Sequence, residues 1–296
     1  MPRVIASIPS PSSGFFELGP LTVHMYGLML LLAISVCIIV TGLRWTKRPG
    51  PAGGDWDLLL RIAVWGVAAG IVGARLYHVI TSWSEVPEPK WQGVFEVWRG
   101  GLGVWGGIAL GTIVGAIITR RAGKSATALM DAAAPGLLLA HGIGRFGNWW
   151  NQELFGKPTD LPWGLEIDPE NRPVQYADSE TFHPTFLYEF IYVTIGAIVL
   201  LLLDRRFRFK PPALFALYVM IYTFGLFFEE LLRVDPSHEL GPLRLNAWVS
   251  IIVFLCSSAL FIWWQFFHDR DRDPRAPRER KVEGPAMAIP KGRVRR

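Results

Sequence analysis

The stretch His141-Gly-Ile-Gly-Arg-Phe-Gly-Asn-Trp-Trp-Asn-Gln-Glu-Leu-Phe-Gly156 follows an apolar run at 132–140 that has the character of a membrane span. At helical spacing, His141, Arg145, Asn148 and Gln152 fall on one face, which is therefore polar and cationic. An arginine at membrane depth costs about 2.5–3.5 kcal/mol on insertion scales and usually faces a cavity or a partner. The pattern predicts a polar pocket at the membrane edge. The planar fork of an arginine suits a phosphate there.

A plainer interpretation is an arginine that snorkels at a helix end, followed by an aromatic belt of Trp149 and Trp150. Three amides and a glutamate lie within eight residues of Arg145, which is more than anchoring needs. The interleaved glycines also allow a backbone or a ligand to approach closely. We therefore favour a site.

The composition is that of a membrane protein, since 51% of the 296 residues are hydrophobic and aromatic residues include 13 Trp and 18 Phe. The formal charge of +5 lies entirely in residues 269–296, where ten Lys/Arg face five Asp/Glu. Such a tail suits anionic membrane lipid, and nothing folded accompanies it that would favour nucleic acid. Cys37 and Cys256 lie in apolar runs and are expected to be packed thiols without disulfide or catalytic roles.

Seven apolar stretches have membrane length, and we expect an all-α integral membrane protein. Lys/Arg-rich loops follow the first, third and fifth stretches, whereas the alternate connections are acidic or mixed. This bias predicts an N-terminus outside and a cytoplasmic C-terminus. The expected spans lie near 22–43, 57–79, 103–119, 127–146, 185–203, 212–232 and 245–267.

These spans divide the chain into three parts. We expect residues 1–21 to be an extracytoplasmic segment without the features of a signal peptide. Residues 22–267 form the membrane domain, whose longest outward loop, 147–184, forms a small extracytoplasmic head. Residues 268–296 are expected to be a disordered cytoplasmic tail that catalysis does not need. Glycines on one stripe of the second and third spans indicate close helix packing.

Polar side chains from five spans fall at the outward membrane boundary. Their shared depth is hard to explain as independent anchoring, so together they indicate one site. Besides the central stretch, this set comprises His24, Tyr26, Arg75, His78, His183, Tyr188, Glu189, Tyr222, Glu229, Glu230 and Arg233.

The motifs resemble those of the prolipoprotein diacylglyceryl transferase family over residues 19–267. The most specific is Gly-Arg-x-Gly-Asn-x-x-Asn-x-Glu-Leu-x-Gly at 144–156. The others are Tyr-Gly-Leu-Met at 26–29, Gly-x-Arg at 73–75, Val-Trp-x-Gly-Gly at 97–101, Gly-Gly at 106–107, His-Pro at 183–184, Leu-Tyr-Glu at 187–189 and Glu-x-x-Arg at 230–233.

The resemblance implies a reaction in the bacterial plasma (inner) membrane, at a site that faces outward. The lipobox cysteine thiol of an exported prolipoprotein attacks the glycerol carbon of phosphatidylglycerol, a thioether forms, and glycerol phosphate leaves. No cofactor or metal is implied. The thiol, with a reference pKa of about 8.5, must lose its proton, and the departing phosphate needs fixed positive charge. The residues alone do not identify the proton acceptor.

The resemblance also assigns roles to residues. Arg145 matches the central arginine of the family and is expected to hold the phosphate. Tyr26, Tyr222 and Glu230 match other functional positions, here taken as catalytic. The remaining residues expected to bind phosphatidylglycerol are Asn148, Asn151, Glu153, Gly156, Arg75 and Arg233.

Two positions depart from the family pattern. Trp105 stands where some members have a histidine, and it cannot take a proton. Leu226 stands where members usually have an arginine, four residues before the glutamate of the sixth span. Either the other arginines suffice, or the chain is a specialised or non-catalytic paralogue that binds lipid or precursor.

Other classes of membrane protein fit less well. A retinal-type receptor needs a lysine in a late span, and the seventh has none. A transporter would show an internal repeat. An intramembrane protease needs a serine or zinc motif or paired aspartates, and Asp131 is the only aspartate well inside a span.

Overall fold

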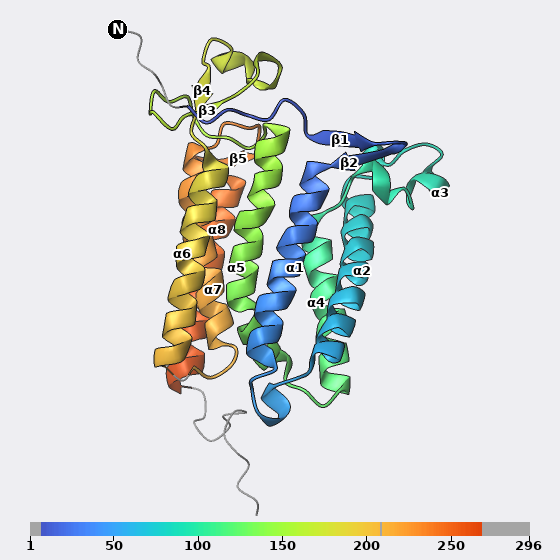
Figure 1. Ribbon diagram of the computed structural model, residues 1–296, viewed down its shortest axis with the longest axis vertical. Helices are drawn as coiled ribbons and strands as arrows, with labels where there is room; N and C mark the ends of the chain where they lie inside the picture. The colour runs from blue at the N-terminus through green and yellow to red at the C-terminus, as the bar shows by residue number, and fades with distance from the viewer. Residues whose placement is uncertain (1–6, 208, 268–296) are drawn as a thin grey trace, which may run out of the picture.

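The computed structural model describes residues 7–207 and 209–267, so the expectations for the basic tail concern residues outside the described part. Within this part, seven helices have 18 or more residues and run side by side (Figure 1). They are α1 (Met25–Trp45), α2 (Trp56–Thr81), α4 (Val104–Arg121), α5 (Ala126–Asn151), α6 (Thr185–Arg206), α7 (Ala213–Leu232) and α8 (Leu245–Ile262), which a π-helical turn extends over Trp263–Phe267.

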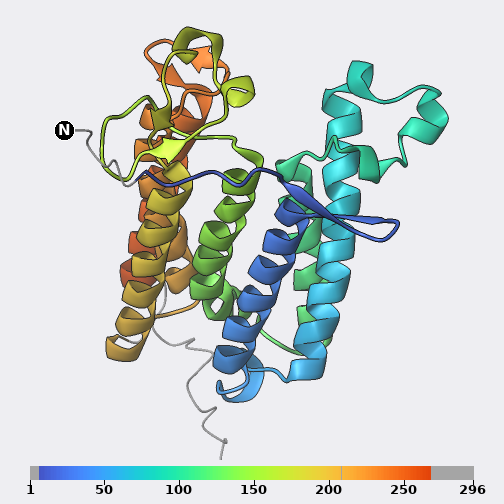
Figure 2. The same cartoon turned by 45° about the horizontal axis from the view of Figure 1, so that its top comes forward.

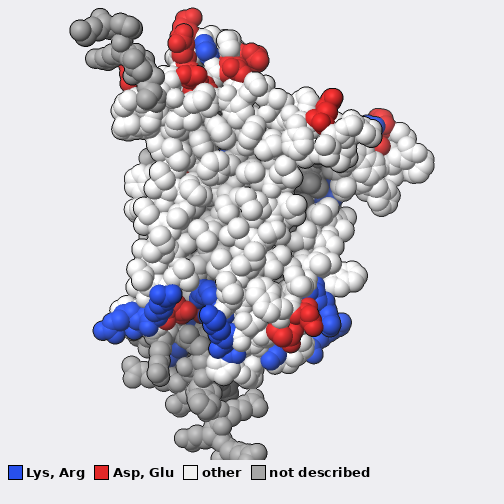
Figure 3. All heavy atoms as spheres, in the orientation of Figure 1, with Lys and Arg blue, Asp and Glu red and all other residues white. Residues whose placement is uncertain are grey.

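Six of the described helices are long and apolar enough to cross a membrane: α1, α2, α5, α6, α7 and α8 with its π-helical turn. The chain is therefore a mostly helical, multi-pass membrane protein. The helix α4, which matches the third predicted span, is not among the six. Figure 3 shows an uncharged belt on the visible face, between an end where Lys and Arg gather and an end with mostly Asp and Glu.

The helix α5 lies at the centre of the bundle, with α1 along one side and α6 and α7 along the other (Figure 1). The helices α2 and α4 form a separate pair, in contact through their glycines. A Cβ atom at Gly73 would lie 2.3 Å from the carbonyl oxygen of Gly106, so only glycine permits this contact. The predicted glycine packing is thus confirmed, and its closest point is Gly73 with Gly106.

Most of the short elements gather at one end of the bundle, whereas the 3-10 turn Gly50–Ala52 joins α1 to α2 at the other end. The hairpin of β1 (Phe15–Leu18) and β2 (Leu21–His24) precedes α1, and the hairpin of β5 (Glu239–Leu240) and β6 (Leu243–Arg244) precedes α8. Residues 83–103, which we call the arm, include α3 (Lys90–Gly93) and the 3-10 turns Trp83–Glu85 and Val97–Arg99. Figure 2 shows the arm and the head as separate projections, with the N-terminal segment crossing between them.

The head contains the antiparallel pair β3 (Leu165–Glu166) and β4 (Thr181–Phe182) and the 3-10 turns Pro169–Asn171 and Val174–Tyr176. Its small apolar core includes Phe155, Leu165 and Phe182. The N-terminal segment is tied to this head, since the amide of Ile8 donates to the carbonyl of Gly164 at 2.8 Å.

Two sequence predictions need correction here. The helix α5 does not end at 146 but continues to Asn151, because helical hydrogen bonding persists after the apolar residues stop. Gln152, in the left-handed conformation at φ 52°, then ends the helix. The two cysteines are free, as predicted, but Cys256 is exposed on α8 rather than packed.

Candidate functional site

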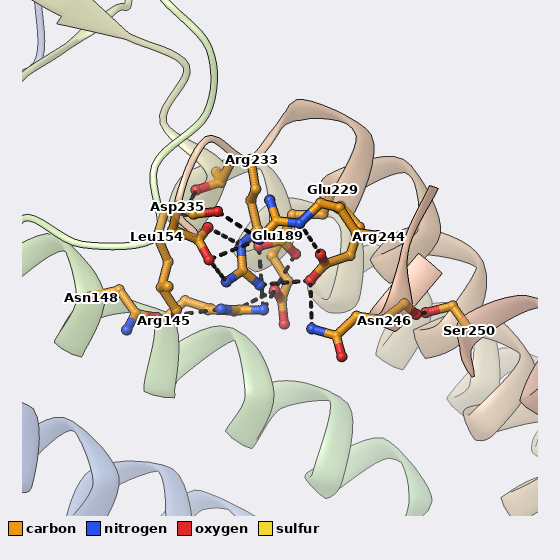
Figure 4. Close-up of polar contacts among 12 residues, drawn as sticks. Arg145, Asn148, Leu154, Glu189, Glu229, Arg233, Asp235, Arg244, Asn246 and Ser250 are labelled. Atoms are coloured by element: carbon orange, nitrogen blue, oxygen red, sulfur yellow. Dashed lines mark hydrogen bonds and ion pairs between the residues drawn. The ribbon is translucent and has the colours of Figure 1, made fainter. Parts of the chain in front are cut away.

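Arg145 lies in the last part of α5, and carboxylates from two other helices hold it (Figure 4). Its Nε donates to Glu189 Oε2 of α6 at 2.5 Å, and one Nη lies 3.2 Å from Glu229 Oε1 of α7. The other Nη reaches Asn148 Oδ1 at 3.5 Å. The guanidinium therefore joins α5, α6 and α7, and its partners are two carboxyl groups and one side-chain amide.

A second ionic group adjoins the first, at the junction of α7 and α8 (Figure 4). Arg233 lies 2.7 Å from Glu230 Oε1 and 2.7 Å from Asp235 Oδ1. Arg244, at the start of α8, lies 3.1 Å from Glu230 Oε2 and 2.8 Å from Asp235 Oδ2. Burial raises the pKa of Asp235, but Arg233 and then Arg244 outweigh this effect and hold that pKa below its ordinary value.

The combined cluster contains Arg145, Arg233 and Arg244 together with Glu189, Glu229, Glu230 and Asp235. Its carboxyl groups outnumber its arginines by one, so the site is not cationic on balance, although the α5 face that carries Arg145 is. An incoming phosphate must share Arg145 with carboxyl groups already in place. Because like charges repel one another in a buried site, the carboxyl groups of the cluster cannot all ionise freely.

The signature at 144–156 owes its form to contacts among its own residues. Asn148 Nδ2 and Asn151 Nδ2 both donate to Glu153 Oε1, at 2.9 and 3.3 Å. Gly147 admits the ring of Tyr26, since a Cβ atom there would lie 2.6 Å from Tyr26 Cδ2. These residues thus shape the helix end beside Arg145.

The end of the signature joins the head to the membrane helices. Leu154 has φ 57°, a left-handed conformation that is costly for a leucine and that persists only where the surroundings impose it. Gly156 accommodates His183, because a Cβ atom there would lie 2.7 Å from His183 Cβ. Burial, and then Lys157, lower the pKa of His183, whose Nδ1 lies 3.1 Å from the Tyr188 hydroxyl.

Two cavities meet at the Arg145 cluster. One of about 660 Å³ is lined mostly by apolar residues of α1, α2, α4 and α5, with Tyr26, Arg145 and Asn148 at its polar part. The other, of about 350 Å³, is apolar and lies between α6 and α7. Glu189 and Tyr222 line both. On the head side, a groove of about 1000 Å³ is lined by Glu153, Leu154, Arg233 and Arg244, and Leu154 also borders the larger cavity.

The structure brings most of the predicted site residues together. Tyr26 and Tyr222 share the larger cavity with Arg145, whereas Arg233 lines the head groove. Glu230 is only 2% exposed and is engaged by arginines. Asn151 and Glu153 line the head groove, and Gly156 lies beside Arg233 in an isolated β-bridge.

Arg75 does not join this site. Its guanidinium is buried under the arm and donates to the carbonyl oxygens of Gly93, Val94, Gly100 and Gly101. The glycines of Val-Trp-x-Gly-Gly have φ of 84° and 70°, which lets the arm turn around Arg75. The structure therefore places Arg75 away from the Arg145 cluster, with its donors on carbonyl oxygens of the arm, and its role in binding phosphatidylglycerol stays a prediction.

Sequence reasoning gave no assigned role to several residues that the structure places in the site. Glu189 and Glu229 were recognised only as polar residues at the right depth. Asp235 and Arg244 belong to a connection that carried no motif, although an arginine directly before an apolar span is a visible signal. The ring of His141 lines the larger cavity and stacks on Tyr222 at 4.0 Å.

The two departures from the family pattern lie in different surroundings. Trp105 is 58% exposed on α4 and does not line either cavity in the described part of the chain. Leu226 lines the smaller cavity, on the same helix as Glu229 and one turn before it.

The fold and the site define a multi-pass membrane protein with a buried, multi-helix ionic cluster open to membrane-level cavities. The family model described as prolipoprotein diacylglyceryl transferase matches residues 13–263. The chain belongs to this family.

Relatives named phosphatidylglycerol–prolipoprotein diacylglyceryl transferase match most of the chain. The Cutibacterium acnes protein is 48% identical, with 86% of each chain covered. The Streptomyces coelicolor protein numbered 2 is 44% identical over 87% of this chain and 81% of its own. The Bifidobacterium adolescentis protein is 40% identical over 87% of this chain and 80% of its own.

Proposed function

We propose that the protein transfers the diacylglyceryl group of phosphatidylglycerol to the lipobox cysteine thiol of exported prolipoproteins. The observation that carries this proposal is Arg145, held by side chains at the junction of two membrane-level cavities within the family signature. A lipid whose acyl chains occupy the larger, mostly apolar cavity would bring its phosphate to Arg145. The thiol sulfur then attacks the glycerol carbon, and the carbon–oxygen bond to the phosphate breaks.

Within this reaction, Arg145 stabilises the charge that builds on the departing phosphate. Asn148, Asn151 and Glu153 hold the helix end that presents it, and Gly156 fixes the return of the chain to the head. Tyr26 and Tyr222 border the reacting groups. Arg233 and Glu230 support the cluster from the head side, where the groove at Leu154 offers a path for the exported polypeptide.

The proposed topology has seven spans, an extracytoplasmic N-terminus and head, and a cytoplasmic tail, in the bacterial plasma membrane. The pairing of α4 with α2 supports the seventh span. Gly106, Gly107, Gly111 and Gly115 of α4 meet Gly73, Gly70, Gly66 and Ile62 of α2 in antiparallel order, from residues 106 to 115 of α4 and from 73 back to 62 of α2. A helix that packs over this length against a spanning partner lies at the same membrane depth as that partner. In intact cells, a membrane-impermeant thiol reagent should label Glu170→Cys and not Arg121→Cys, both exposed positions, after Cys256 is replaced by serine.

Transfer to a synthetic lipobox peptide tests the activity directly. The purified protein, given phosphatidylglycerol, should add the mass of one diacylglyceryl group to the peptide cysteine, and a cysteine-to-serine peptide should stay unmodified. Phosphatidylglycerol binding without transfer would instead support the specialised, non-catalytic member that Leu226 left open.

A further inference from the structure

The transfer reaction leaves the thiol proton without an assigned acceptor, and the Arg145 cluster contains a group suited to receive it. Glu189 and Glu229 come from neighbouring helices and both contact Arg145. Two carboxylates on one guanidinium carry one negative charge more than the guanidinium neutralises, so the pair is suited to take up a proton.

One oxygen of this pair is available for chemistry. The side chain of Glu189 is 5% exposed, and its Oε2 is engaged by Arg145. Its Oε1 is buried without a hydrogen-bond donor among the described residues. Glu189 also lines the larger cavity, which Glu229 does not. This buried carboxylate oxygen lacks a hydrogen-bond donor and lies beside the proposed phosphate anchor, so it can accept a proton from a substrate bound there.

We propose that Glu189 is the catalytic proton acceptor for the attacking thiol, with Glu229 as the positioning residue that shares the Arg145 guanidinium with it. This inference rests on the proposed function. As the sulfur–carbon bond forms, the thiol proton passes to Glu189, and the electron pair of the breaking carbon–oxygen bond leaves with the phosphate. Glu189 then returns the proton to the phosphate of glycerol phosphate, which restores the resting charge.

Other titratable groups face Glu189 and are less suited to this role. Arg145 keeps its protons, and the phenol of Tyr222 is itself protonated near pH 7. His141 of α5 is the one competitor, but its Nε2 bonds the Tyr218 hydroxyl at 2.9 Å, and its ring stacks on Tyr222 rather than on Arg145. Tyr188 of α6 bonds His183 and Trp163, and Arg233, which pairs with Glu230 and Asp235, keeps its protons as Arg145 does.

The test compares two peptides that differ in one atom, a lipobox peptide with cysteine and the same peptide with selenocysteine. A selenol is ionised at pH 7 and needs no base. Glu189→Gln should slow transfer to the cysteine peptide by about 100-fold or more, as expected for loss of a general base. Transfer to the selenocysteine peptide should fall by less than about tenfold. The variant's rate with cysteine should also rise about tenfold per pH unit toward the thiol pKa near 8.5.

The matched control is Glu230→Gln, which removes another buried carboxylate of the cluster, one that lines neither cavity. It should slow both peptides by the same factor, because its effect passes through Arg233 and Arg244. The ratio of the two rates is internal to each folded sample, so it does not depend on yield. If Glu189→Gln does not fold, Glu189→Asp gives the same comparison, since it moves the carboxylate back by one methylene.

Equal losses for the two peptides in Glu189→Gln, or no loss, would overturn the assignment. The assignment would also be overturned if His141→Asn, and not Glu189→Gln, slowed transfer to the cysteine peptide more than transfer to the selenocysteine peptide. The proton acceptor would then be the histidine. The unmodified protein is assayed first. Absence of transfer by the unmodified protein contradicts the proposed function. If the unmodified protein transfers but Glu189→Gln slows both peptides equally, only this inference is contradicted.

Discussion

The arm and the α5–α7 cluster each bury an arginine, and the two arginines are satisfied in opposite ways. Arg75 donates to four backbone carbonyls of the arm, whereas Arg145 is held by the side chains of Glu189, Glu229 and Asn148. Carbonyl oxygens of a folded segment cannot leave without unfolding that segment. Carboxyl groups can turn aside or take a proton. The first arrangement therefore fixes structure, and the second can exchange a protein partner for a ligand.

The comparison also explains why burial alone is a poor guide to function. Arg75 is 5% exposed and the Arg145 side chain 15%, both follow a glycine at short spacing, and both belong to motifs of the family. What distinguishes them is the kind of acceptor and the presence of a cavity at Arg145. Substitution of each arginine should therefore affect different observables.

The largest effect should follow the loss of Arg145. Arg145→Ala should lower the transfer rate by about 100- to 1000-fold, the usual cost of removing one preorganised donor to developing charge. Arg145→Lys should recover little, because an ammonium cannot replace a bidentate fork. Single-turnover transfer to a lipobox peptide measures the rate, and elution as a monodisperse species in detergent checks folding. A folded Arg145→Ala protein with the parental rate would contradict the role of this arginine.

The loss of Arg75 should instead reduce stability. Arg75→Ala leaves four carbonyl oxygens without their donor, and each buried acceptor left unpaired costs about 1–3 kcal/mol. We expect the melting temperature in detergent to fall by roughly 10 °C. Proteolysis within residues 83–103 should increase at the same time.

The control is Arg99→Ala in the same arm. Arg99 pairs with Glu96 at the surface, so its removal should change the melting temperature very little. If Arg75→Ala retains its melting temperature and its resistance to protease but loses transfer, Arg75 belongs to the site after all.

Hydropathy and loop charge predicted the helices well, because an apolar span and its basic ends are local features of the sequence. Each long helix starts and ends within a few residues of its predicted span, and α5 differs most, because hydropathy does not register a helix that continues with polar residues. His141 and Asn148 were also placed correctly beside Arg145, since helical spacing fixes which residues of a motif share a face.

Contacts between helices were harder to predict. Sequence spacing gives the depth of Arg75 but not the direction of its side chain, and the arm that receives it lies 18 to 26 residues away along the chain. Glu230 forms its second ion pair with Arg244, which lies directly before the following helix. Such long-range pairing has no local pattern, so the sequence alone could not show that Arg145 is held by two carboxyl groups.

A smaller effect is expected at Asp235, which distinguishes ionic support from catalysis within the cluster. Its lowered pKa means that ionised Asp235 stabilises the fold above the ordinary aspartate pKa of about 3.9, and this contribution is lost as pH falls through the lower folded value. Asp235→Asn should lower the melting temperature by a few degrees, equally at pH 6 and pH 8. The difference should shrink only below about pH 4. Asp178→Asn, at an exposed position in the head, is the control and should show no such difference.

The smallest effect, and the one that tests the exchangeable character of the cluster, concerns Leu226. It lines the cavity between α6 and α7, and Glu229 lies three residues further along the same helix. An arginine introduced there would meet a carboxyl group at i, i+3 rather than bare hydrocarbon. Leu226→Arg should therefore fold, and its transfer rate should stay within about threefold of the parent or exceed it, since a further donor near the phosphate strengthens charge stabilisation. Ile252→Arg is the matched control, because Ile252 is 57% exposed on α8 and lines neither membrane-level cavity. That substitution should lower the melting temperature clearly, as a lipid-facing charge does. If Leu226→Arg destabilises the protein as much as Ile252→Arg, or slows transfer more than tenfold, the carboxyl groups around Arg145 are too tightly committed to accept a new cation. The exchange of a carboxyl group for phosphate would then need a larger rearrangement than this structure implies.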